Sequence, residues 1–97
     1  MARFALFAPL EAKPGQEEAL AAFLKQGEAM SRQEDGTRTW YAVRFGPSSF
    51  AIFDTFDDEA GRQAHLSGDI AKALMANADT LLASPPDIRQ AEIIGEK

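Results

Sequence analysis

The spacing of hydrophobic residues changes along the first third of the chain and predicts a strand followed by a helix. Residues 4–10 are apolar on both alternating sets of positions, as in a strand covered on both faces. Pro9 has no backbone N–H to donate, so this end of the strand is expected at an edge or a bulge. Within residues 13–30 the apolar side chains recur near the helical period. This predicts an amphipathic helix with Gly15 as its N-cap.

Two segments rich in aromatic and β-branched residues predict a hairpin. They are residues 37–45 and 49–56, and a turn-forming Gly-Pro-Ser triplet separates them. If the turn consists of that triplet alone, Asp54 lies opposite Trp40, whereas one more turn residue places Tyr41 there. The pattern leaves both registers open.

Two further helices are predicted after the hairpin. Asp57 or Asp58 is expected to cap a short helix that runs through Leu66, where a Ser-Gly pair interrupts it. Asp69 is expected to cap a second helix over residues 70–82, in which the apolar positions form one continuous face. A Ser-Pro-Pro sequence then forces a loop.

The last predicted element is a strand over residues 88–94. The resulting order of strands and helices fits a ferredoxin-like α+β fold, a four-stranded antiparallel sheet with helices on one face. A chain of 97 residues is long enough for one such domain, expected over residues 1–97.

The predicted sheet has more apolar side chains than its helices can cover. Large residues are distributed over both faces, namely Phe4, Leu6, Phe7, Phe50, Ile52 and Phe53. Each such side chain left in water forfeits about 1.5 to 3 kcal/mol. We therefore expect a second copy of the chain to cover the open face, giving a homodimer whose two sheets meet as a barrel.

Composition and charge restrict the classes of partner. The net charge of -5 and the scattered Lys and Arg residues disfavour nucleic acid and anionic membranes. No apolar run approaches the roughly 18 residues of a spanning helix, and a cytoplasmic protein is expected. The chain has no cysteine, which excludes disulfides, thiolate nucleophiles and cysteine-ligated metals.

Four stretches together resemble the antibiotic biosynthesis monooxygenase family, small dimeric α/β-barrel proteins. They are AKPGQEEAL before the first helix, QEDG followed by Trp40, FDTFDDEAGRQAHL, and SPPDIRQAEI near the end. The strongest piece is Asp54, a spacer and Phe56, followed by a helix that ends in Ala-His-Leu at His65. The chain departs from the family pattern at Phe56, where tryptophan is frequent, and at Asp54, where glutamate is common.

The resemblance implies a cofactor-independent oxygenation. In such a reaction a hydroxylated aromatic or quinol loses a proton, and its anion reduces dioxygen without a bound cofactor. The sequence also has no GxGxxG, P-loop or HExxH motif, so neither a cofactor nor a metal is predicted. Haem is not expected either, because Leu74 and Met75 lie where the haem-degrading relatives carry a histidine that ligates iron.

His65 and Asp54 are the candidate catalytic residues. An imidazole can accept a proton at neutral pH, so His65 is predicted as the base or anchor for the substrate. The alternative is a structural histidine that binds loop backbone or the helix C-terminus. Asp54 would be costly to bury alone, and a partner such as Arg44, Arg62 or an aromatic donor is expected.

Four residues are candidates for substrate binding. Trp40 and Phe56 are predicted to wall an aromatic pocket, although aromatic residues in strands also fill ordinary cores. Arg44 is the predicted charged contact. Asn77 interrupts the apolar face of the last helix, so its amide needs a buried neighbour, a water or a ligand as partner.

Two other functions fit the same sequence. One is a non-catalytic dimer that binds a small apolar ligand or acts as a stress-associated protein. The absence of a second histidine, and the phenylalanine in place of tryptophan, favour it. The other is a small isomerase or lactone-processing enzyme, which would turn over without consuming oxygen.

Overall fold

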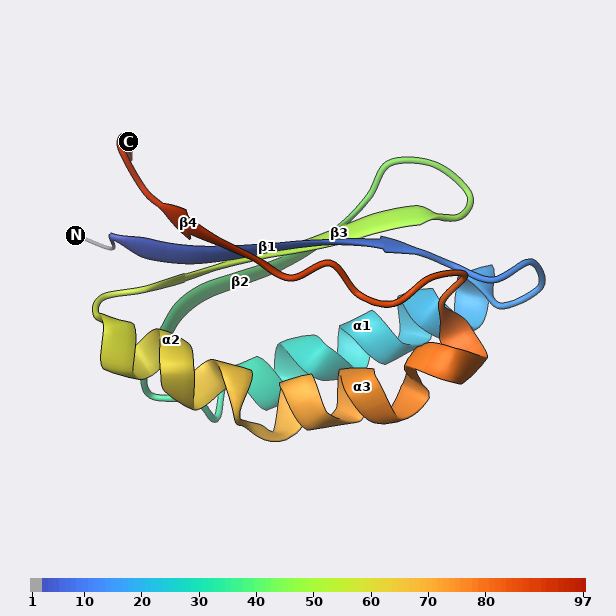
Figure 1. Cartoon of the computed structure of the whole chain (residues 1–97), viewed down its shortest axis with the longest axis horizontal. Coiled ribbons are helices and arrows are strands. Elements are labelled where there is room, and N and C mark those ends of the chain that lie inside the picture. Colours follow the sequence, from blue (N-terminus) through green and yellow to red (C-terminus); the bar gives the residue numbers. More distant parts are fainter. Residues whose placement is uncertain (1–2) are drawn as a thin grey trace.

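The computed structural model, which describes residues 3–97, shows a four-stranded antiparallel sheet with all three helices on one side (Figure 1). The strands follow the order β2-β3-β1-β4 across the sheet. This arrangement confirms the ferredoxin-like α+β prediction. In chain order the elements are β1 (Phe4–Glu11), α1 (Glu17–Ser31), β2 (Thr37–Arg44), β3 (Ser49–Phe56), α2 (Glu59–Leu66), α3 (Asp69–Leu81) and β4 (Arg89–Glu92).

Two of the three predicted helix N-caps are wrong in the structure. Gly15 has a φ of +87° and forms the turn before α1, whose N-cap is Gln16. Glycine suits this turn, because it adopts the left-handed backbone region without the steric cost that a side chain would bring. Asp69 is the first residue of α3 rather than its cap. Asp58 caps α2 as predicted, since its Oδ1 accepts a 2.7 Å hydrogen bond from the backbone N–H of Gly61.

The β2–β3 hairpin adopts the first of the two predicted registers. Trp40 lies opposite Asp54 and Arg44 lies opposite Phe50. Because side chains alternate between the faces of a strand, both pairs point to the same side of the sheet. Phe50 belongs to the core formed with the helices, so this side is the one that the helices cover.

The core fills the space between the sheet and the helices. α1 contributes Leu20 and Leu24, and α3 contributes Ile70, Leu74 and Leu81, all of them buried. The prediction that Asn77 lies on the apolar face of the last helix is wrong, because its side chain is exposed to solvent. Its Nδ2 donates to the carbonyl of Ala73 at 2.8 Å, so the amide finds its partner one turn back on its own helix.

The other face of the sheet carries exposed hydrophobic side chains. Tyr41, Val43, Phe45 and Phe53 are between 37% and 68% exposed there. They occupy the positions that alternate with the helix-facing residues of β2 and β3. Exposed apolar side chains gathered on one face of a sheet are typical of interaction surfaces.

The edge strand next to β1 is short. β4 pairs only with the first half of β1 and is shorter than the predicted strand at 88–94. Pro9 lies in the half of β1 that has no strand beside it on that side, which confirms the expected edge. None of the helices in residues 3–97 is both long enough and apolar enough to cross a bilayer.

Candidate functional site

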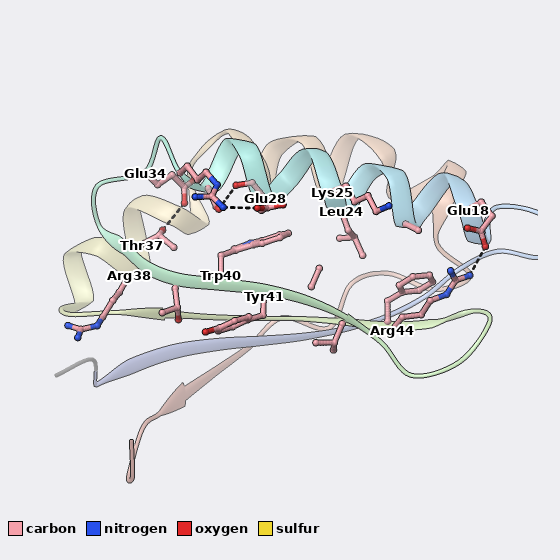
Figure 2. A pocket seen from close by; sticks show the side chains of 17 residues that line it. Glu18, Leu24, Lys25, Glu28, Glu34, Thr37, Arg38, Trp40, Tyr41 and Arg44 are labelled. Atoms are coloured by element: carbon pink, nitrogen blue, oxygen red, sulfur yellow. Dashed lines mark hydrogen bonds and ion pairs between the residues drawn. The ribbon is translucent and has the colours of Figure 1, made fainter. Parts of the chain in front are cut away.

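A groove of about 770 Å³ lies between α1 and the edge strand β2 (Figure 2). Its floor is apolar and includes Leu24, Trp40 and Phe50. Gly27 makes room for the indole, because a Cβ atom at this glycine would lie 3.1 Å from two carbons of the Trp40 ring. The absence of a side chain on one turn of α1 therefore lets Trp40 lie directly beneath the helix.

The indole nitrogen of Trp40 is the unusual polar atom of this groove. Nε1 is buried and has no hydrogen-bond partner among residues 3–97. A buried N–H usually has a partner, and leaving one unpaired costs about 1 to 3 kcal/mol. The atom has almost no accessible surface, so a ligand oxygen would reach it only after the surrounding side chains shift.

Polar contacts between α1, the loop after it and β2 close the two ends of the groove (Figure 2). At one end Nη2 of Arg44 lies 2.7 Å from Oε2 of Glu18, and the guanidinium carbon is 4.9 Å from the centre of the Phe50 ring. At the other end the hydroxyl of Thr37 donates a 2.7 Å hydrogen bond to Oε1 of Glu34. The groove therefore has the Arg44–Glu18 pair at one end and the carboxylate of Glu34 at the other, and its lining also includes Lys25, Glu28, Arg32 and Arg38.

His65 lies between two carboxylates beside the Glu34 end of the groove. Its Nδ1 is 2.6 Å from Oε1 of Glu34, and its Nε2 is 2.9 Å from Oδ2 of Asp54. The second contact has the distance of an ion pair, but its direction is too bent for a full hydrogen bond. Phe56 packs against the imidazole with the ring centres 5.4 Å apart. These contacts bring β3, α2 and the loop after α1 together.

The two carboxylates control the charge of His65. Burial by itself would lower the pKa of His65, but the close contacts with the charged groups of Asp54 and Glu34 outweigh burial and raise the pKa. Burial raises the pKa of Asp54, and the neighbouring imidazole acts against that rise. The two carboxylates therefore favour the charged form of His65. Because a carboxylate lies against each ring nitrogen, neither nitrogen is free to accept a proton from a ligand. His65 can instead orient the two acids through its charge.

A second, smaller cavity of about 340 Å³ lies on the other side of Glu34. His65, Gly61 and Gly68 line it, and Glu34 and Thr37 line both cavities. Glu34 thus links the groove to the His65 cluster. In the described part of the chain no group of three side chains is arranged to hold a metal ion, since the two carboxylates lie at opposite nitrogens of one ring.

The predicted site residues divide into three groups in the structure. His65 and Asp54 lie in contact, and Trp40 and Arg44 both line the groove. Phe56 is fully buried beneath His65 and does not line the groove, so it cannot be a pocket wall in this arrangement. The exposed Asn77 likewise lies outside both cavities.

Neither arginine considered as the partner of Asp54 has that role. Arg62 donates from Nη1 to the carbonyls of Ala5 and Ala91, at 3.3 and 3.2 Å. The partner of Asp54 is His65 instead. The prediction also omitted Glu34, the second carboxylate of the cluster. Its only sequence signal was its place in the QEDG segment, 31 residues from His65.

Comparison with known families gives one match that covers most of the chain. Residues 3–77 match the family model described as antibiotic biosynthesis monooxygenase. That range contains the groove and both residues of the Asp54–His65 pair. No match was found among curated proteins.

Solved structures share the fold over nearly their whole length. The NE2512 protein of Nitrosomonas europaea, of unknown function, is 59% identical with a TM-score of 0.96, covering 100% of this chain and 94% of its own. PA3566 of Pseudomonas aeruginosa is 24% identical with a TM-score of 0.82, over 98% and 97% of the two chains. Rv0793 of Mycobacterium tuberculosis is 20% identical with a TM-score of 0.85, over 98% of each chain. The last two support the fold alone.

Proposed function

Because the chain belongs to the antibiotic biosynthesis monooxygenase family, we propose that it is a cofactor-independent monooxygenase acting on a small hydroxylated aromatic or quinol. The observation that carries the proposal is the groove between α1 and β2, with its aromatic floor and the unpartnered indole N–H of Trp40. A largely apolar cavity with a few directed polar groups is the usual form of a small-molecule site.

In the proposed reaction the substrate supplies all four electrons that reduce dioxygen. The ring hydroxyl loses its proton, and a ring carbon ortho or para to that oxygen bonds to dioxygen and releases its hydrogen as a proton. The O–O bond then breaks, so that one oxygen atom stays on the ring as a carbonyl and the other leaves as water. A phenol and dioxygen thereby give a quinone and water without an outside reductant.

The groove contains groups suited to the charge that develops in this reaction. The indole N–H of Trp40 would donate to the ring oxygen as negative charge collects on it. The carboxylate of Glu34 would accept the hydroxyl proton at the end of the groove and pass it to solvent. His65 and Asp54 would hold Glu34 in place. The raised pKa of His65 disfavours its predicted role as the base, and its contact with Glu34 favours a positioning role instead.

We also propose that the protein is a homodimer through the open face of its sheet. The exposed side chains of Tyr41, Val43, Phe45 and Phe53 support this assembly, because a second copy would remove them from water. The groove lies mainly on the opposite, helix-facing side of the sheet. Tyr41 and Val43 of the edge strand line it as well, so a second copy would contact one wall of the groove.

A non-catalytic dimer that binds a small ligand is the second candidate. The observation that favours it is the state of His65, since both ring nitrogens already face carboxylates. Such a protein would use the same groove and the same Trp40 donor. The two candidates differ in whether the ligand is consumed together with oxygen.

Oxygen uptake by metal-stripped protein with a panel of polyhydroxylated aromatics tests the proposal. A blank without protein is needed because such compounds autoxidise. The Trp40→Phe variant keeps an aromatic ring but removes the donor, so uptake should fall by about 100-fold. Met75→Leu, which changes an exposed residue of α3 outside both cavities, is the control and should leave uptake unchanged. Uptake no greater than the blank across the panel would favour the non-catalytic candidate.

A further inference from the structure

Arg44 is held in place at one end of the groove by three contacts that do not involve a ligand. Nε donates to the carbonyl of Gly46 at 3.2 Å, and Nη2 donates to the carbonyl of Pro47 at 2.8 Å. The guanidinium also lies over the ring of Phe50, which forms part of the groove floor. The hairpin turn and an aromatic ring thus fix a positive charge where the groove ends.

The carboxylate that faces this charge is weakly held. Glu18 reaches Arg44 from α1 through one contact of 2.7 Å, and its side chain is 81% exposed while that of Arg44 is 38% exposed. The hydrogen bond and charge of Arg44 lower the pKa of Glu18, so Glu18 is a carboxylate at neutral pH. Exposed ion pairs contribute little to stability and are screened by salt, so another carboxylate can replace this one.

We propose that Arg44 binds the carboxylate of an aromatic acid, and that Glu18 occupies this position when the groove is empty. The inference rests on the proposed use of the groove as the substrate site and specifies the class of substrate, a hydroxylated aromatic carboxylic acid. With the carboxylate on Arg44, the ring would lie over Phe50. Trp40 is four residues away along β2, about 13 Å, so a substrate that also reaches Trp40 must have more than one ring. The hydroxyl group would point toward the other end, where Glu34 provides an acceptor.

The other arginines of the groove do not have these features. Arg32 pairs with Glu28 on the same helix and its side chain is 73% exposed. Arg38 pairs with Asp57 beyond the groove lining. Because the protein carries a net charge of -5, long-range electrostatics oppose an anionic ligand. Recognition of a carboxylate must therefore come from a local contact such as that with Arg44.

Calorimetric titration with 2,5-dihydroxybenzoate and with hydroquinone, anaerobically at pH 7 and low salt, tests the inference. The acid should bind about tenfold more tightly than hydroquinone, as expected for one charge-assisted contact. Arg44→Gln should abolish this difference. Glu18→Gln should tighten binding of the acid several-fold and leave hydroquinone unchanged, since it removes a competitor for Arg44. Arg89→Gln, which also removes an exposed arginine paired with one acid but lies outside the groove lining, should leave the ratio of the two affinities unaltered.

The opposite effects of the two variants distinguish recognition from a structural role. If the Glu18–Arg44 pair only stabilised the groove, Glu18→Gln would weaken both ligands, and that result would overturn the inference. Equal binding of acid and hydroquinone by the wild-type protein, or binding of neither, would also overturn it. If Arg44→Gln fails to fold, the binding of the two ligands to Glu18→Gln decides whether the inference holds. The experiment does not depend on oxygenation, so an acid preference without oxygen uptake would reject the proposed reaction and retain the inferred ligand.

Discussion

Nδ1 of His65 lies 2.6 Å from Oε1 of Glu34, a residue 31 positions earlier in the chain. This contact joins α2 to the loop between α1 and β2, and Asp54 of β3 holds the other side of the ring. The imidazole is only 8% exposed, so its charge interacts with both acids in a partly desolvated environment. The cluster therefore links the protonation of one residue to the packing of three segments.

Stability should fall as the pH rises above about 6.5, the usual pKa of histidine. The folded state raises the pKa of His65, so its contribution is complete below the unfolded pKa and is lost as the pH passes through the folded value. Asp54 acts in the same direction, because its raised pKa also means that the folded state holds its proton more tightly. Urea unfolding at pH 6, 7, 8 and 9 measures the slope, and His65→Gln should flatten it. A wild-type stability that increases over this range would contradict the assignment.

Removal of the Glu34 charge should lower the pKa of His65. Because His65 is the only histidine in the chain, its ring proton signals can be followed by NMR without ambiguity. Wild-type protein should titrate above 6.5, and Glu34→Gln should shift the midpoint down. Glu28→Gln, which removes an exposed acid of α1, is the control and should have no effect. The same midpoint in both variants would mean that Glu34 does not determine the charge of His65.

Alanine at Gly36 or Gly61 should destabilise the protein by about 1 to 3 kcal/mol. A Cβ atom at Gly36 would lie 2.9 Å from Cα of Gly61, and one at Gly61 would lie 2.8 Å from the carbonyl oxygen of Gly36. The helix propensity of alanine favours the second change by about 1 kcal/mol, which the backbone clash should exceed. Gly46→Ala is the matched control, because no other described atom lies within 4 Å of its added Cβ. Equal urea midpoints for all three variants would show that the close approach has no role in packing.

Sedimentation should give twice the chain mass for the wild-type protein and the mass of one chain for Tyr41→Glu. The substitution places a charge in the apolar face proposed to form the dimer, where it would be desolvated. Met75→Glu tests a hydrophobic residue that is similarly exposed, 59% against 57%, but belongs to α3. It should remain dimeric. A dimer that survives Tyr41→Glu and dissociates with Met75→Glu would place the interface on the helices.

The periodicity of hydrophobic residues predicted the fold well, because a local sequence pattern determines each strand and helix. The aromatic and β-branched run at 49–56 coincides with β3, and the turn triplet gave the observed register as one of its two alternatives. The caps of the first and last helices were each wrong by one residue, and that of the middle helix was right. A cap depends on backbone angles, such as the positive φ of Gly15, that residue preferences indicate only approximately.

The site was predicted only in part because its contacts are long-range. Asp54 and His65 lie in one short strand-turn-helix segment, and their resemblance to a family pattern drew attention to both. Glu34 comes from a distant loop, and no spacing rule connects it to His65. Asn77 was placed incorrectly because helical spacing gives the face of a residue but not the option of a side-chain bond to its own helix.

The most direct test of the central claim is the fate of isotopically labelled dioxygen. Metal-stripped protein is incubated under ¹⁸O₂ with a phenolic substrate that it consumes, and the product is analysed by mass spectrometry against a blank without protein. The proposed reaction predicts one labelled oxygen atom in each quinone, on the newly formed carbonyl, with the other atom in water. Protein-dependent product without the label, or no protein-dependent product from any compound that the groove binds, would contradict the assignment as a monooxygenase.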